Sequence, residues 1–306
     1  MLAIIGVIAL IASCAKDGEQ GPAGANGTDH TAVSAADKTA FDGANGFTGG
    51  LLYDHLMNQL LINDTALTKH ANFYRCKSCH GWDLLGRNGV LAQQAITSSY
   101  PEVAVNNLYA WSHMHNVREV FDAVKNTGGN YVGYLRVAAG SSTNSSAAAM
   151  PDYGQILTDA QIWDIVKFLK KDAMDVSHFY DFAVVKPYPQ PTKDESAVEF
   201  YNIGKLGDPV RGANLITTKC GGCHGNDGSD INIYCQGDWL GNTFRDDPFE
   251  VQHKVKFGMP VDRDHLTTSC AGQNNSAMPA ITNITEQDIR DILTAGQDTV
   301  AYPSYH

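Results

Sequence analysis

The segment that decides the fold is RCKSCHGWD, Arg75 to Asp83, in which two cysteines are separated by two residues and a histidine follows the second one directly. The same arrangement returns in KCGGCHGND, Lys219 to Asp227. A C-x-x-C-H segment is typical of covalent haem attachment, because the two thiols can add to the two vinyl groups while the adjacent histidine binds the iron. Two such segments predict two covalently bound haem groups.

Zinc binding and thiol redox chemistry also use C-x-x-C pairs. A four-cysteine zinc site normally joins pairs that lie close in the sequence, whereas nearly half of the chain separates Cys79 from Cys220. A thioredoxin-like pair would follow a strand in a βαβ surround, which the sequence does not indicate. Haem attachment is therefore the preferred interpretation, with these two as its alternatives.

Each C-x-x-C-H segment is followed, further along the chain, by a Met-Pro pair and a helix signal. The stretch AMPDYGQILTDAQIWDIVKFLKK, from Ala149, lines up with AMPAITNITEQDIRDILTAGQ, from Ala277. In each copy a threonine can cap the first helical turn while the residue three positions later reaches back to it. Apolar residues then recur on one helical face. The repeat predicts two modules of one design, both mainly helical.

On these motifs the chain resembles a dihaem c-type cytochrome built from two class I cytochrome c modules, from about Gly50 to the C-terminus. The resemblance implies an all-α fold with two such domains in tandem and two covalently bound haem c groups. The residues to which it gives covalent attachment are Cys76, Cys79, Cys220 and Cys223, and those to which it gives the proximal iron bond are His80 and His224.

The family places the distal ligand in a Met-Pro pair just before the last helix, which implies Met150 and Met278. Met259, in KFGMP, is also followed by proline and stays a competitor of Met278, although it lies much further from the capping threonine. In the first module, WSHMHN offers His113 and His115 as an alternative pair of candidates. A thioether raises the haem potential relative to a second histidine, and two filled axial positions leave only outer-sphere electron transfer.

Composition and linkers set the domain limits. The 306 residues are about twice an ordinary domain, and the stretch Val184 to Glu195 carries three prolines, which predicts a semi-rigid linker. The predicted domains are 50–175 and 196–306, joined by a linker at 176–195. With 22 basic and 33 acidic side chains the formal charge is -11, which excludes nucleic acid as a partner and suits a basic docking protein.

The N-terminal run MLAIIGVIALIASC is too short to cross a bilayer, which needs about 20 apolar residues, and has the length of a signal-peptide core. Its end, IASC, resembles the lipobox of bacterial lipoproteins, which implies a lipidated Cys14 and an outer-membrane anchor. The sequence departs from the lipoprotein pattern because no basic residue precedes Lys16. A plain secretory signal and a buried apolar segment are the alternatives. The Gly-rich stretch after Cys14 predicts a flexible tether over residues 15–49.

Two further cysteines remain after the motifs and Cys14 are assigned. Cys235 and Cys270 are expected to form a disulfide in an oxidising compartment, with free thiols or haem ligation as the alternatives. Histidines outside the motifs and WSHMHN, such as His55 and His178, are expected at the surface.

The sequence therefore predicts an exported carrier, periplasmic or at the cell surface, that passes single electrons between a donor and an acceptor protein. It could belong to a longer haem chain or be the cytochrome subunit of a dehydrogenase, and self-assembly is left open. The alternative is a dihaem enzyme. Dihaem peroxidases need one open iron, against which the methionine in each module argues. Thiosulfate dehydrogenases use a cysteine ligand in the N-terminal module, whereas the spare cysteines of the folded body lie in the second.

Overall fold

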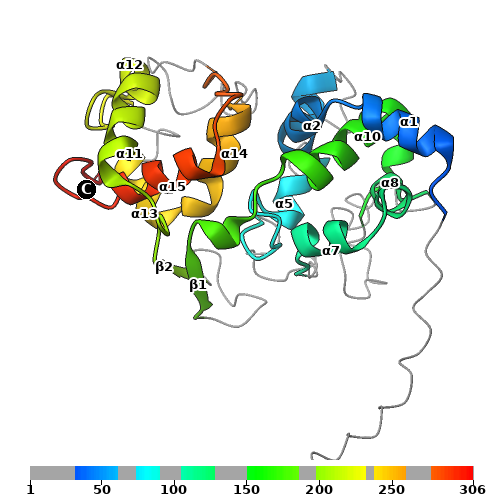
Figure 1. Cartoon of the computed structure of the whole chain (residues 1–306), viewed down its shortest axis with the longest axis horizontal. Helices are drawn as coiled ribbons and strands as arrows, with labels where there is room; N and C mark the ends of the chain where they lie inside the picture. Colours follow the sequence, from blue (N-terminus) through cyan, green and yellow to red (C-terminus); the bar gives the residue numbers. More distant parts are fainter. Residues whose placement is uncertain are drawn as a thin grey trace, which may run out of the picture.

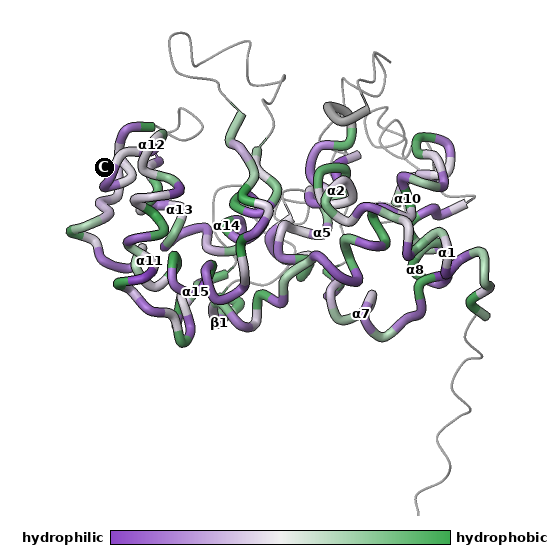
Figure 2. The backbone as a smooth tube through the Cα atoms, turned by 45° about the horizontal axis from the view of Figure 1, so that its top comes forward, coloured by the Kyte–Doolittle hydropathy of each residue, from purple (hydrophilic) through white to green (hydrophobic). Residues whose placement is uncertain are grey.

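The computed structural model describes residues 32–60, 74–89, 105–127, 150–185, 198–231, 238–259 and 277–305. These residues form two helical lobes that lie side by side (Figure 1). Figure 2 shows that apolar and polar residues are intermixed along the helices of both lobes. Among the described residues, no helix combines the length and apolar character needed to cross a membrane.

The first lobe carries the first C-x-x-C-H segment on a short helix. Its helices are α1 (Ala35–Gly43), α2 (Gly46–Leu60), α5 (Cys76–His80), α7 (Leu108–Met114), α8 (Val117–Lys125) and α10 (Asp159–Lys167), with the 3-10 turn η1 (Tyr153–Gln155) and the π-helical turn η2 (Phe168–Asp172). The predicted cap of α10 is confirmed: Thr158 Oγ1 accepts from the Gln161 backbone at 3.3 Å, and Gln161 Oε1 accepts from the Thr158 backbone at 2.8 Å.

The second lobe repeats this plan. Its helices are α11 (Pro209–Leu215), α12 (Gly221–His224), α13 (Leu240–Asp246), α14 (Pro248–Phe257) and α15 (Glu286–Ala295), with the π-helical turn η4 (Ile216–Cys220) between α11 and α12. The predicted cap of α15 is also confirmed, because Thr285 Oγ1 accepts from the Asp288 backbone at 3.1 Å and Asp288 Oδ2 accepts from the Thr285 backbone at 2.8 Å.

In each lobe the first long helix crosses the last one at a glycine. A Cβ added to Gly49 of α2 would lie 1.9 Å from the carbonyl oxygen of Asp164 in α10. A Cβ added to Gly212 of α11 would lie 1.9 Å from the carbonyl oxygen of Asp291 in α15. The two backbones therefore approach as closely as only glycine allows, and this crossing fixes the frame on which each C-x-x-C-H turn is held.

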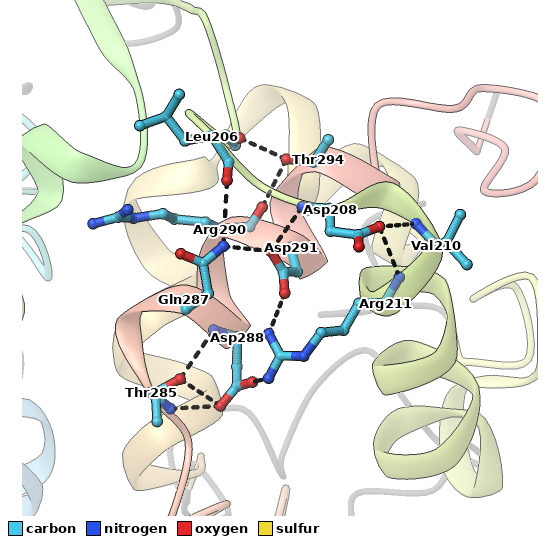
Figure 3. Close-up of polar contacts among 11 residues, drawn as sticks. Leu206, Asp208, Val210, Arg211, Thr285, Gln287, Asp288, Arg290, Asp291 and Thr294 are labelled. Atoms are coloured by element: carbon cyan, nitrogen blue, oxygen red, sulfur yellow. Dashed lines mark hydrogen bonds and ion pairs between the residues drawn. The ribbon is translucent and has the colours of Figure 1, made fainter.

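The side chains of the same two aspartates also cap the helices that their backbones cross, α2 and α11. Asp164 Oδ1 accepts from the Asn45 backbone at 2.7 Å, just before α2, and Asp291 Oδ1 accepts from the Asp208 backbone at 2.8 Å, just before α11. In the second lobe Arg211 adds ion pairs to Asp288 and Asp291 (Figure 3). The repeat thus extends beyond the aligned motifs: α2 with α10, and α11 with α15, share the same glycine crossing and the same aspartate cap.

Gly212→Ala is expected to lower the free energy of unfolding by about 1–3 kcal/mol, because the new methyl group must push two helices apart. Gly43→Ala is the matched control: nothing lies within 4 Å of its added Cβ, so it should be neutral or stabilise by at most about 1 kcal/mol. Urea unfolding of both variants measures the difference. Equal stabilities would show that the close crossing is absent.

The predicted tether over residues 15–49 is wrong at its C-terminal end. Ser34 Oγ accepts from the Asp37 backbone at 3.0 Å and so caps α1, and Phe41 of α1 is buried in the core of the first lobe. The first domain therefore already includes residues 35–49, because a capping signal follows the glycine-rich run and starts a helix there.

The predicted linker also contains folded residues. The 3-10 turn η3 (Val176–His178) begins it, and Val176, Phe179 and Tyr180 are buried in the core of the second lobe. Two short strands then follow, β1 (Asp181–Val184) and β2 (Val198–Tyr201), which pair antiparallel with Asp181 opposite Tyr201. Strands of four residues are too short to show an alternating pattern in the sequence, and both modules are mainly helical, as predicted.

Helix α14 joins the two lobes. Its last residue, Phe257, is buried in the core of the first lobe, where its ring lies 5.3 Å from that of Phe168. Conversely, Trp82 of the first lobe is buried in the core of the second, and its carbonyl oxygen accepts from Gln252 Nε2 of α14 at 2.9 Å. Because each core contains an aromatic residue of the other lobe, the lobes are packed together and are not merely tethered.

Candidate haem-binding sites

Each C-x-x-C-H segment is helical and ends at a glycine: the first forms α5, and in the second Cys220 ends η4 and the other four residues form α12. Helix α5 stops at Gly81, with φ 72°, whose N–H donates to the Lys77 carbonyl at 2.8 Å. Helix α12 stops at Gly225, with φ 78°, whose N–H donates to the Gly221 carbonyl at 3.0 Å. Such a positive φ suits glycine and turns the chain away directly after the histidine. Two thiols and one imidazole are thereby gathered on a single turn, as covalent haem attachment requires.

The loops after the two turns repeat each other as well. The carbonyl of His80 accepts from the backbone of Gly86 at 2.8 Å, and the carbonyl of His224 accepts from that of Asp230 at 2.9 Å. Asp83 and Asp227, three residues after each histidine, both accept from the backbone two residues further on, at 3.1 Å in each loop. Both histidine backbones are thus held by the same local hydrogen bonds, although the loop sequences differ.

The thiols are poorly suited to redox exchange. Burial raises the pKa of Cys76 and of Cys79 to about 12, and that of Cys220 to about 11. Redox-active pairs need a lowered pKa, because the thiolate is the reactive form. The two pairs also lie in different lobes, and no group of three or more metal-ligating side chains occurs in the part of the chain that the structure describes.

Both histidines are in the form that binds a metal. Burial lowers the pKa of His80 to about 4, and it lowers the pKa of His224 as well. Both rings are therefore neutral near pH 7, and a neutral imidazole nitrogen is what ligates iron. In the described structure His224 Nδ1 is buried without a hydrogen-bond partner, so no hydrogen bond at this nitrogen competes with iron binding by the ring. The residues present fit a haem at each turn.

The structure brings each predicted distal methionine to the core of its own motif. Met150 and Cys76 both pack against the core of the first lobe, and Met278 and Cys220 both pack against the core of the second. In the first lobe Asn126 Nδ2 donates to the Met150 carbonyl at 2.6 Å and fixes the Met-Pro segment beside the end of α8. Their role as iron ligands stays a prediction.

The histidines of WSHMHN lie on and just after α7. His113 is exposed, its Nδ1 lies 2.8 Å from the Tyr109 carbonyl, and its ring packs on the Tyr109 ring at 4.2 Å. His115 is half-buried, with Nδ1 2.8 Å from the Trp111 carbonyl and its ring stacked on that indole at 4.2 Å. Both rings therefore pack on aromatic neighbours of their own segment, whereas Met150 packs on the core that contains the motif.

Three predicted residues lie outside the described part of the chain. They are the lipid-anchor candidate Cys14 and the predicted disulfide partners Cys235 and Cys270.

Sequence reasoning missed a buried charge cluster directly before the first motif. Arg75 donates from Nη2 to Asp54 Oδ1 at 2.8 Å and from Nε to the Asp54 carbonyl at 2.6 Å, and its Nη2 lies 2.8 Å from His55 Nε2. Burial raises the pKa of Asp54, but Arg75 and its charged neighbours outweigh burial and lower it to about 2. The expectation that His55 lies at the surface is wrong: it is 4% exposed, at a kink of α2.

A second missed feature is the cationic clamp on Trp82 between the lobes. Lys77 of the first motif lies with Nζ 3.5 Å from the indole centroid, and Lys254 of α14 lies 4.8 Å from it. Both lysines are nearly buried, and burial lowers the pKa of Lys77 to about 7, so its cation–π contact with Trp82 is complete only below neutral pH. The only sequence signal was the pair of basic residues that flank Cys76; the helix that completes the clamp lies far along the chain.

Fold and sites define a protein with two tandem helical modules, each carrying one C-x-x-C-H turn and one Met-Pro segment. The Cytochrome c family model matches residues 68–172 and 209–294, and the chain belongs to the cytochrome c family. The predicted tandem all-α fold and the two covalently bound haem c groups are thereby confirmed. No curated protein and no solved structure matches the chain in these comparisons. Haem-based electron transfer with redox partners is the activity that follows.

Proposed function

We propose that this protein is an exported, non-catalytic dihaem carrier that passes single electrons between a donor and an acceptor protein. The observation that carries the proposal is the duplicated arrangement of a C-x-x-C-H turn and a Met-Pro segment on one core in each lobe. A haem iron with both axial positions filled alternates between its ferric and ferrous states and so transfers one electron at a time. It has no free position for a substrate.

In this proposal each side chain has a defined task. Cys76 and Cys79 hold the first haem and Cys220 and Cys223 the second, so that neither cofactor can dissociate. The proximal ligands are His80 and His224, and the distal ligands are Met150 and Met278. The buried aromatic residues of each core exclude water from the sites, which limits reorganisation when the charge of the iron changes.

The shared helix α14 supports a role that uses both haems together. Phe257 and Trp82 each occupy the core of the opposite lobe, and Lys256 Nζ of α14 donates to the Asp172 carbonyl of the first lobe at 2.7 Å. The distance between the two sites is thus set by packing and not by a flexible linker. A fixed distance suits a two-centre electron path, because transfer between centres depends steeply on their separation. The net charge of -11 further suits a basic redox partner.

A redox titration followed by haem absorbance tests this function. Two one-electron transitions are expected, together with no turnover of peroxide or thiosulfate. Turnover of either substrate, accompanied by binding of an external ligand to one iron, would instead support the dihaem-enzyme alternative.

The lipid anchor is a separate part of the proposal. Cys14→Ser is expected to move the protein from the membrane fraction to the soluble fraction, because the acyl chains would no longer be attached. Immunoblots of fractionated cells measure the distribution. Cys270→Ser is the control and should leave fractionation unchanged. A Cys14→Ser protein that stays with the outer membrane would contradict lipid anchoring at this residue.

A further inference from the structure

The second lobe holds two methionines directly opposite each other. Met259 and Met278 form an isolated antiparallel bridge, in which Met259 N donates to the Met278 carbonyl at 3.0 Å and Met278 N donates to the Met259 carbonyl at 2.9 Å. Residues that exchange both hydrogen bonds in this way direct their side chains to the same face, about 5 Å apart. The two thioethers therefore start from neighbouring points on one side of the bridge.

The bridge is fixed by backbone contacts on both sides. Helix α14 ends at Gly258, with φ 77°, where an added Cβ would lie 2.4 Å from the Met278 carbonyl oxygen. A further bond, from the Ile281 backbone to the Val255 carbonyl at 2.9 Å, continues the contact past the Met-Pro pair. Neither methionine depends on its own side chain for its position. A change of one side chain should consequently leave the other in place.

In the first lobe the Met-Pro segment at Met150 is held by a different contact, which involves no second thioether. Helix α8 ends at Asn126 in the left-handed conformation, and its Nδ2 donates to the Met150 carbonyl at 2.6 Å. The described residues after α8, Asn126 and Thr127, carry no sulfur. A side-chain amide thus holds Met150 in the first lobe, whereas a backbone bridge from Met259 holds Met278 in the second. The chain itself offers a matched comparison between a site with one thioether and a site with two.

We propose that Met259 is a second distal ligand for the iron of the second haem, able to bind when Met278 does not. The exchange breaks one iron–sulfur bond and forms another of the same kind, and transfers neither an electron nor a proton. Both ligands are soft, neutral thioethers, so the iron remains low-spin after the exchange. If the distal methionine leaves the iron, the second haem can therefore bind Met259 in its place, whereas the first haem becomes accessible to external ligands. This inference rests on the proposed carrier function and its methionine ligation.

Leucine variants test the proposal, because leucine keeps the volume of methionine but cannot bind iron. The readout is the methionine-to-ferric-iron charge-transfer band of the oxidised protein, together with its spin state by electron paramagnetic resonance. Met278→Leu should keep two methionine-ligated haems, as should Met259→Leu. Met150→Leu, the matched control, should keep one. The double variant Met259→Leu/Met278→Leu should also keep one.

Loss of the second methionine-ligated haem in Met278→Leu alone would overturn the proposal and leave the carrier function intact. Loss of the second methionine-ligated haem in Met259→Leu alone would also overturn the proposal, because Met259 would then be the primary ligand. A wild-type protein that lacks two methionine-ligated haems would contradict the proposed ligand set, and this inference with it. Helical circular dichroism of every variant checks that the fold is retained.

Discussion

A chain with Cys220→Ser and Cys223→Ser is expected to carry one covalent haem instead of two. Thioether bonds to both cysteines attach the cofactor, and a hydroxyl cannot form them under the same conditions. Because the two C-x-x-C-H turns lie in different lobes, attachment in the first lobe should proceed unchanged. Intact-protein mass and haem absorbance per chain, both after extraction of non-covalent haem, measure the number directly.

The matched control is the pair Cys76→Ser and Cys79→Ser, which should also leave one haem, now in the second lobe. Proteolysis followed by mass spectrometry assigns the remaining haem to one of the two segments. Two covalent haems in either variant would show that the substituted turn is not an attachment site. So would a haem assigned to the segment that has lost its cysteines.

Asp54→Asn is expected to lower the free energy of unfolding by about 3–5 kcal/mol at pH 7, because it removes the negative charge that faces the buried guanidinium of Arg75. The folded-state pKa of Asp54, about 2, lies below the unfolded value of about 3.9. A carboxyl of this kind stabilises the fold above pH of about 4 and loses that contribution as the pH falls toward 2. The difference between wild type and variant should therefore shrink over that window.

Urea unfolding at pH 7, 4 and 3 measures this difference. Asp42→Asn serves as the control, because Asp42 pairs with Lys38 at the exposed surface, where water screens the pair, so its loss should change the stability little. A cost for Asp54→Asn that is equal at pH 7 and pH 3, or no greater than that of the control, would contradict a paired, charged Asp54 in the fold.

Local signals in the sequence were sufficient to predict the two modules, which the family match confirms, and to nominate the candidate site residues, whose roles stay predictions. The spacing of two cysteines and a histidine fits on one helical turn, and Thr158 and Thr285 mark helix starts by a bond that spans only three residues. Because the residues of such a motif lie within one helical turn, a few consecutive residues of sequence are enough to predict it. The order of motif, Met-Pro pair and last helix then repeats, which is why the tandem fold was predictable.

Contacts between distant segments were not predictable in this way. Helix α14 is buried on almost all sides because it serves two cores, but its sequence, PFEVQHKVKF, mixes charged and apolar residues without a clear face. The burial of His55 depends on Arg75, and the clamp on Trp82 depends on Lys254 from the other lobe. The opposition of Met259 and Met278 likewise follows from how a glycine ends α14, which no spacing rule reveals.

In the proposed carrier, a histidine and a methionine bind the iron of each haem, and both haems serve only to transfer electrons. The spectrum of the fully oxidised, haem-loaded protein tests it most directly, by counting the haems that show the methionine-to-ferric-iron charge-transfer band and by detecting high-spin iron. Two low-spin, methionine-ligated haems per chain are predicted. A high-spin haem, or one ligated by thiolate or by a second histidine, would contradict histidine–methionine ligation at that haem and favour a dihaem enzyme.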